Sequence, residues 1–184
     1  YDKRFTDQLN LDTSHCLTII NPVSDQLSHL ADSLIPGLLK NVEDNINEFD
    51  DLSFFEINAT WQPINSAEHK EQQRLAGIFF SRRAPVNFFE KKALCSRLFE
   101  QSNLFDITWK TEELPTNPWV DQTQYATIWN GTIRVGSMGF VKHAFLRQLT
   151  GVLPESSALV FDLDYELLKN PTHHIVAFKP ISRY

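Results

Sequence analysis

The chain has 184 residues, 42% of them apolar and 22% charged, a composition that allows one globular domain with a proper core. Its net charge of −6, from 17 basic and 23 acidic residues, argues against a broad phosphate-binding surface. No apolar stretch reaches the roughly 20 residues of a membrane helix and none resembles a signal peptide, so we expect a cytoplasmic protein without membrane contact.

The first half of the chain alternates between helical and extended patterns. In chain order, it is predicted to hold a small helix at 2–9, a short strand at 15–20, an amphipathic helix at 34–46, and strands at 52–61 and 74–80 joined by a polar loop at 62–73. With Ser33 as N-cap, Pro36 falls in the first turn of the amphipathic helix. There its missing N–H costs no hydrogen bond, so this proline begins a helix and does not interrupt one.

The second half is richer in strand signals. In chain order, it is predicted to hold a helix at 88–101, a strand at 105–110, a hairpin at 125–138, a short helix at 142–149, a strand at 158–165, one helical turn at 166–169 and a last strand at 173–178. Asn87 and Glu90 form a capping pair for the first of these helices. Asn130-Gly131 supplies the positive φ values of a type I′ hairpin turn. Hairpins with inserted helices predict an α+β domain whose largely antiparallel sheet buries one face against the helices.

Local signals for chemistry are weak. Asp162 and Asp164 alternate on a predicted strand and share one face, which would suit paired carboxylates in acid/base work or a bound cation. A strand whose aspartates face water explains the same pattern better. Arg82 and Arg83 could hold an anion, but a short basic loop is usually solvated. We therefore assign no catalytic residue.

The two cysteines do not indicate a redox or metal site either. Cys16 and Cys95 are far apart and in no CxxC or Cys/His spacing. Neither a disulfide framework nor a zinc site is suggested, so we expect buried free thiols. The sequence names no cofactor-binding or metal-ligating residue in this domain.

Seven segments of the chain, taken in order, resemble motifs of one known family. The first, NPVSDQLSHLADSLIPGLLKNV, resembles a family stretch that contains NPLSEE and SLLPGLL. The others are, in chain order, LSFFEINATW, RLAGIFF, PVNFFEKKALCSRLFE, NGTIRVGSMGFV, ALVFDLDYELL and FKPISRY. Each motif is modest alone, but their order from Asn21 to Tyr184 is specific, and it resembles that of the bacterial phenylalanine-tRNA synthetase β subunit. We expect residues 1–184 to be one domain cut from a longer polypeptide.

The resemblance implies the catalytic-like core of that β subunit, with a class II aminoacyl-tRNA synthetase fold. It also implies an α subunit that joins phenylalanine to its tRNA with ATP and magnesium in a heterotetramer, and most tRNA contacts outside this domain. Active class II domains hold ATP with an Arg-x-Glu strand. Here Glu56 is present, but Phe54 stands where arginine is required, and an uncharged ring cannot pair with a phosphate. The resemblance therefore implies a noncatalytic structural and assembly domain.

In the family, the helix that corresponds to residues 34–46 helps to form the α/β interface. The residues that the resemblance nominates for this contact are Leu34, Ile35, Leu38, Leu39, Val42 and Ile46. Packing inside the chain explains the same apolar stripe equally well. The chain departs from the family pattern at Ala31-Asp32 and in the loop from Asn117 to Ala126, which marks it as a divergent member.

Two other functions stay open. A stand-alone binding module would pair through the same helix with a second copy of itself. A small-molecule enzyme would use the Asp162/Asp164 face or the Arg82/Arg83 loop, and it predicts that these side chains line one concave pocket.

Overall fold

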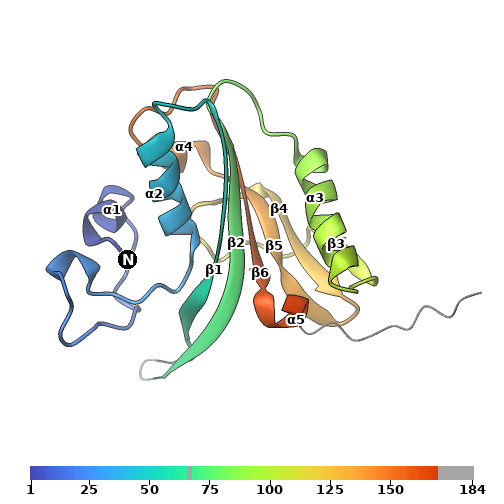
Figure 1. The fold of residues 1–184 in the computed structure, drawn as a ribbon, viewed down its shortest axis with the longest axis horizontal. Coiled ribbons are helices and arrows are strands. Elements are labelled where there is room, and N and C mark those ends of the chain that lie inside the picture. Colours follow the sequence, from blue (N-terminus) through green and yellow to red (C-terminus); the bar gives the residue numbers. More distant parts are fainter. Residues whose placement is uncertain (66–67, 170–184) are drawn as a thin grey trace, which may run out of the picture.

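One antiparallel sheet runs through the middle of the molecule, with helices on both sides (Figure 1). The structure is a computed structural model that describes residues 1–65 and 68–169. The strands are β1 (Asp51–Pro63), β2 (His69–Ser81), β3 (Ile107–Lys110), β4 (Val120–Asn130), β5 (Ile133–Val141) and β6 (Ser157–Asp164). Their order across the sheet is β1-β2-β6-β5-β4-β3, and every neighbouring pair is antiparallel. The α+β class and the antiparallel sheet are thus confirmed.

The helices differ in whether a side chain caps their first turn. They are α1 (Lys3–Gln8), the 3₁₀ turn η1 (Asp25–Leu27), α2 (Ile35–Asn45), α3 (Phe88–Gln101), α4 (His143–Leu146) and α5 (Tyr165–Lys169). Pro36 lies in the first turn of α2 as predicted, but the N-cap is Leu34 and not the predicted Ser33. The Ser33 hydroxyl still accepts from the Ile35 N–H at 3.2 Å. The Asn87 side chain caps α3. Among the described residues, no helix is long and apolar enough to cross a membrane.

The sheet separates two hydrophobic cores. Side chains alternate along each strand, so Ala76 and Ile78 of β2 enter the first core while Leu75 enters the second. Helices α1, α2 and α4 cover the first core, and α3 and α5 cover the second (Figure 1). The expectation that only one face is buried is wrong. The uninterrupted apolar run in β2 already fits a strand that is covered on both sides.

The hairpin of β1 and β2 is longer than predicted. The expected loop at 62–73 is wrong for most of its length, because β1 reaches Pro63 and β2 starts at His69. The polar residues there continue the backbone ladder beyond the core, and ladder hydrogen bonds need no apolar side chain. The strand expected at 15–20 is also wrong, since that stretch holds only the isolated bridge between Thr18 and His29.

The hairpin of β4 and β5 is confirmed with a different turn. Asn130 pairs with Ile133, so the turn residues are Gly131 and Thr132. Only Gly131, at φ +59°, has a positive φ, which fits a type II′ turn and not the predicted type I′. Much of the divergent loop at 117–126 forms the start of β4. The strand predicted at 173–178 lies outside the described residues.

Candidate functional site

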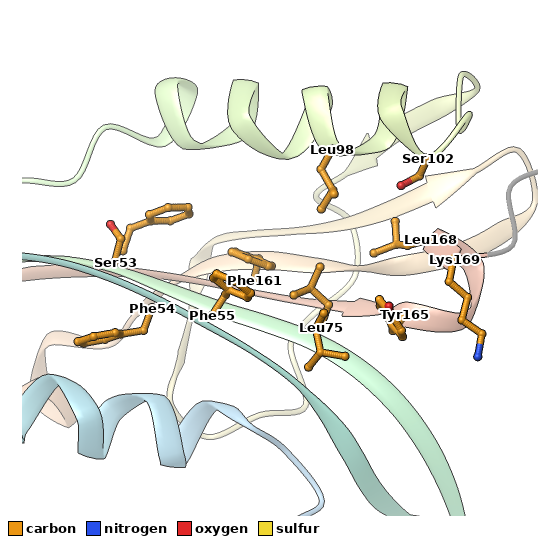
Figure 2. A pocket seen from close by; sticks show the side chains of 12 residues that line it. Ser53, Phe54, Phe55, Leu75, Leu98, Ser102, Phe161, Tyr165, Leu168 and Lys169 are labelled. Carbon is orange, nitrogen blue, oxygen red and sulfur yellow. The ribbon is translucent and has the colours of Figure 1, made fainter.

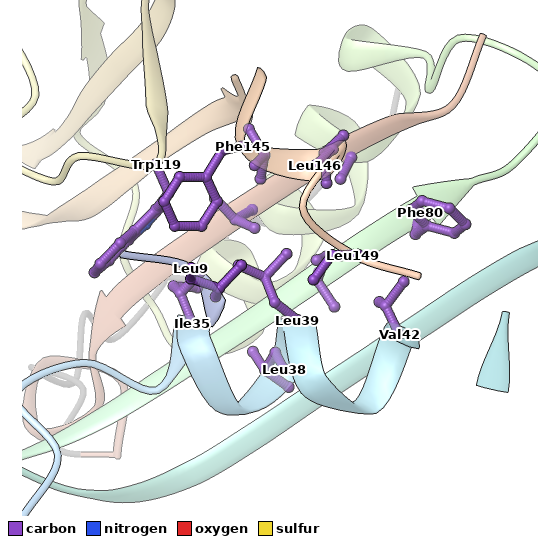
Figure 3. Close-up of a cluster of buried hydrophobic side chains, with 14 of the residues drawn as sticks. Leu9, Ile35, Leu38, Leu39, Val42, Phe80, Trp119, Phe145, Leu146 and Leu149 are labelled. Carbon is purple, nitrogen blue, oxygen red and sulfur yellow. The ribbon is translucent and has the colours of Figure 1, made fainter. Parts of the chain in front are cut away.

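The six residues of α2 and its two flanking positions that were expected to contact a partner are all buried within this chain. Their exposed fractions lie between 0% and 5% for the set Leu34, Ile35, Leu38, Leu39, Val42 and Ile46. They pack in the first core with residues of α1, α4 and the sheet, as Figure 3 shows for several of them. Packing inside the chain therefore accounts for the whole stripe, and a partner contact through it stays a prediction.

An apolar groove opens on the opposite face of the sheet, between β1 and helices α3 and α5. It has a volume of about 470 Å³ and is lined mainly by the apolar side chains of Phe55, Ile57, Leu75, Phe79, Leu98, Phe161 and Leu168. Figure 2 shows Leu98 pointing from α3 toward the sheet. β1 is an edge strand, and on it Phe55 is 73% and Ile57 44% exposed. Within residues 1–65 and 68–169, no strand pairs with the outer edge of β1. A strand edge of this kind beside an apolar groove is suited to bind an extended apolar segment.

A second apolar surface lies between α1 and α2. The two arms of this irregular segment meet at the Thr18–His29 bridge, with η1 near its far end. Ile20 is 93%, Val23 104% and Leu27 52% exposed. Three such exposed apolar side chains within one short segment make this segment a candidate contact site. We call these three residues the apolar tip. Sequence reasoning missed it because residues 15–20 were predicted to form a strand.

Phe54 and Glu56 lie on the α2 side of β1, and Phe54 is also one of the residues that border the apolar groove. Phe54 packs against the first core, and Figure 2 shows its ring on the side of α2, away from Leu98. The Glu56 carboxylate accepts from the Asn58 side-chain amide at 3.0 Å. Neither side chain lines the polar cavity described next.

A polar cavity of about 340 Å³ lies on the first-core face, and both aspartates of β6 line it. Arg74 Nε lies 2.9 Å from Asp162 Oδ1, and the Asp162 side chain is only 22% exposed. The expectation that this aspartate faces water is therefore wrong. Burial raises the pKa of the Asp162 carboxyl, although the Arg74 guanidinium opposes that shift. Arg134 also lines the cavity, so the cavity wall contains charged side chains of both signs.

The two arginines after β2 have structural roles. Arg82 donates to the backbone carbonyls of Gly151 at 3.1 Å and Ile46 at 3.2 Å, so it joins the segment before β6 to the end of α2. Arg83 pairs with Asp50 at 2.7 Å, and its side chain is 64% exposed. Neither arginine lines the cavity that holds the two aspartates. An enzyme whose single pocket contains both the two aspartates and this arginine loop is thus excluded.

Both cysteines are buried free thiols, as predicted. Burial raises the pKa of the Cys95 thiol to about 12. Burial and the nearby Asp32 carboxylate raise the pKa of the Cys16 thiol to about 11. Neither thiol is a strong nucleophile at neutral pH, because the thiolate is the reactive form.

Comparison with known proteins identifies one family. The model of the phenylalanyl tRNA synthetase β chain CLM domain matches residues 1–165. Among similar proteins are three that are named phenylalanine–tRNA ligase β subunit. That of Moorella thermoacetica is 25% identical over 98% of this chain, that of Chlorobium chlorochromatii 27% over 95%, and that of Geobacter metallireducens 26% over 89%. The matched parts cover 24%, 24% and 21% of these relatives, so the chain spans about a fifth to a quarter of their length.

Proposed function

This chain belongs to the CLM-domain family of phenylalanyl-tRNA synthetase β chains, and we propose that it is a noncatalytic structural and assembly domain. In this proposal, it has a class II synthetase-like fold and supports an α subunit that joins phenylalanine to its tRNA with ATP and magnesium. The assembly is a cytoplasmic heterotetramer that binds tRNA largely through other domains. The six-stranded antiparallel sheet with helices on both faces supports the fold assignment.

The position of Phe54 carries the noncatalytic part of the proposal. A phosphate-binding arginine would have to stand there and reach an open cavity. Phe54 instead packs against the first core beside α2. The neighbouring Glu56 is hydrogen-bonded to Asn58 on the same strand. An uncharged aromatic ring that packs against a core neither binds nor neutralises a triphosphate.

The assembly part rests on the exposed apolar surfaces. The groove beside β1 presents Phe55 and Ile57, and the apolar tip presents Ile20, Val23 and Leu27. Removing such side chains from water stabilises a complex by about 25 cal/mol per Å² of apolar area, before the costs of association. We therefore assign the α-subunit contact to the groove and the apolar tip. The apolar stripe of α2 packs inside the chain and is not part of this contact.

The experiment is light scattering on a size-exclusion column, with the chain alone and then mixed with the α subunit of the same organism. We expect a heteromeric peak for the wild-type chain. The double variant Phe55→Ser/Ile57→Thr should raise the Kd of this complex at least about tenfold, which corresponds to 1.4 kcal/mol. Ile133→Thr, which alters a 54% exposed residue next to the β4–β5 turn, is the matched control. Equal binding by all three proteins would contradict the assigned surface.

Two further measurements test the alternatives. Pyrophosphate exchange by the purified chain with phenylalanine and ATP would contradict the noncatalytic proposal. A homodimer of the chain alone in the same light-scattering run would favour the stand-alone binding module. The enzyme hypothesis that uses Asp162 and Asp164 keeps one supporting observation, because both line one polar cavity. It requires that Asp162→Asn abolish turnover of the substrate while the chain stays folded.

A further inference from the structure

A nitrogen, a sulfur and an oxygen donor converge at the base of the segment between α1 and α2. They belong to His15, Cys16 and Asp32, and their ligand atoms all lie within 4.8 Å of one another. His15 Nε2 is 2.8 Å from Asp32 Oδ2. The thiol of Cys16 lies in the buried part of this cluster, while the imidazole is 41% and the carboxylate 22% exposed.

We propose that His15, Cys16 and Asp32 bind a divalent transition-metal ion, with Zn²⁺ the best fit. Zinc takes thiolate, imidazole and carboxylate ligands at about 2.0–2.3 Å in tetrahedral geometry. Magnesium and calcium prefer oxygen donors alone, so a set with one thiol and one imidazole does not suit them. Tetrahedral ligands lie roughly 3.3–3.8 Å apart at these bond lengths, so only small side-chain shifts are needed.

Neighbouring groups hold two of the three ligands in place. The Tyr1 hydroxyl donates to Asp32 Oδ1, which leaves Oδ2 on the side of His15. The His69 ring donates to the His15 carbonyl at 2.9 Å and so fixes the backbone of that ligand. Metal sites depend on such supporting hydrogen bonds because these orient the ligands before the ion binds.

Two of the three proposed ligands border a cavity. A cavity of about 320 Å³ is lined by both His15 and Asp32, together with Asp12 and Trp119. A zinc ion with three protein ligands keeps one open position, which a water molecule fills. The Trp119 ring N–H is buried without a hydrogen-bond partner within the described residues, and it belongs to the wall of this same cavity.

Metal binding would join the two ends of the segment that carries the apolar tip. Residues 15 and 16 lie before the Thr18–His29 bridge and residue 32 lies after it. An ion shared by both ends lowers the entropy that the segment gains on local opening. It also stabilises the folded chain by mass action, since the three ligands are together only in the folded state. This proposal would overturn the prediction that the domain has no metal-ligating residue.

Cobalt(II) is the probe that tests the site, because a cobalt–thiolate bond gives a near-ultraviolet charge-transfer band. The 184-residue chain, kept reduced, is titrated with Co²⁺, and Zn²⁺ is then added to displace it. We expect a band that Cys16→Ala and Cys16→Ser abolish and that Zn²⁺ removes. Cys95→Ala, which removes the other buried thiol, should leave it unchanged. His15→Ala and Asp32→Asn should each weaken Co²⁺ binding by at least about tenfold.

Circular dichroism shows whether each variant is folded, and His15→Ala gives a test at a more exposed ligand if the Cys16 variants unfold. Absence of the band in the wild-type chain at millimolar Co²⁺ would overturn the proposal. So would a band that persists in folded Cys16→Ser, or one that Cys95→Ala removes instead.

Discussion

Replacing Leu38 by alanine removes a side chain that is fully buried between α2 and the sheet. Full burial of a leucine stabilises a fold by about 1.5–3 kcal/mol, and the cavity left behind adds to the loss. We expect Leu38→Ala to lower the free energy of unfolding by about 2–5 kcal/mol. That is a large share of the roughly 5–15 kcal/mol that stabilises a typical domain.

Urea unfolding followed by circular dichroism measures this change. With an m-value near ~2 kcal/mol/M, the midpoint should fall by about 1–2.5 M. In a thermal melt, a chain of this size should lose roughly 4–20 °C in Tm. Asn41→Ala on the exposed face of the same helix is the control and should stay within about 0.5 kcal/mol of the wild type.

The same variant separates the two roles considered for the α2 stripe. A core role predicts lower stability of the chain by itself. An interface role predicts unchanged stability and weaker association with the α subunit. A loss below about 1 kcal/mol in the isolated chain would refute the packing described for Leu38.

Three further predictions concern the arginines after β2, the turn residue Gly131 and the thiol of Cys95. Arg82→Ala should lower the free energy of unfolding by about 1–3 kcal/mol because it leaves two backbone carbonyls without their donor. Arg83→Ala should lower it by at most about 1 kcal/mol, as for other exposed ion pairs. Urea titrations of the two variants compare these losses. Gly131→Ala should cost about 1–2 kcal/mol because φ is +59° there, and Gly131→Asn should recover part of the loss in the same assay; equal stability of both variants and the wild type would contradict the strained turn. The folded-state pKa of Cys95 is raised from 9.0 to about 12, so the contribution of its protonated thiol is fully present below pH 9 and is lost as pH rises toward 12. The stability difference between the wild type and Cys95→Ala should therefore shrink from pH 8 to pH 10.5, and a difference independent of pH would contradict the raised pKa.

Elements with strong local signals were predicted well from the sequence. Asn87 caps α3, Pro36 opens α2 and Gly131 forms a hairpin turn, because each acts on backbone within a few residues of itself. The apolar stripe of α2 was also correct as a stripe. Its periodicity indicates that one face is buried, but it does not indicate whether the chain itself or a partner covers that face.

The length of the β1–β2 hairpin was not predicted from the sequence. Polar residues such as Lys70 and Gln73 carry no strand signal, and they are extended because they pair with β1. Pairing between strands is a nonlocal contact, so side-chain pattern alone misses the part of a ladder that lies beyond the core.

The sequence by itself determined the family, the α+β class, and the start of the main helices, since these depend on residue order and on local backbone preferences. Only the tertiary structure decided that both faces of the sheet are covered and that Phe55 and Ile57 lie at an open groove. It also brought Asp32 beside His15 and Cys16. These features arise where segments distant in sequence meet, and the free energy of such contacts depends on which surfaces the fold brings together.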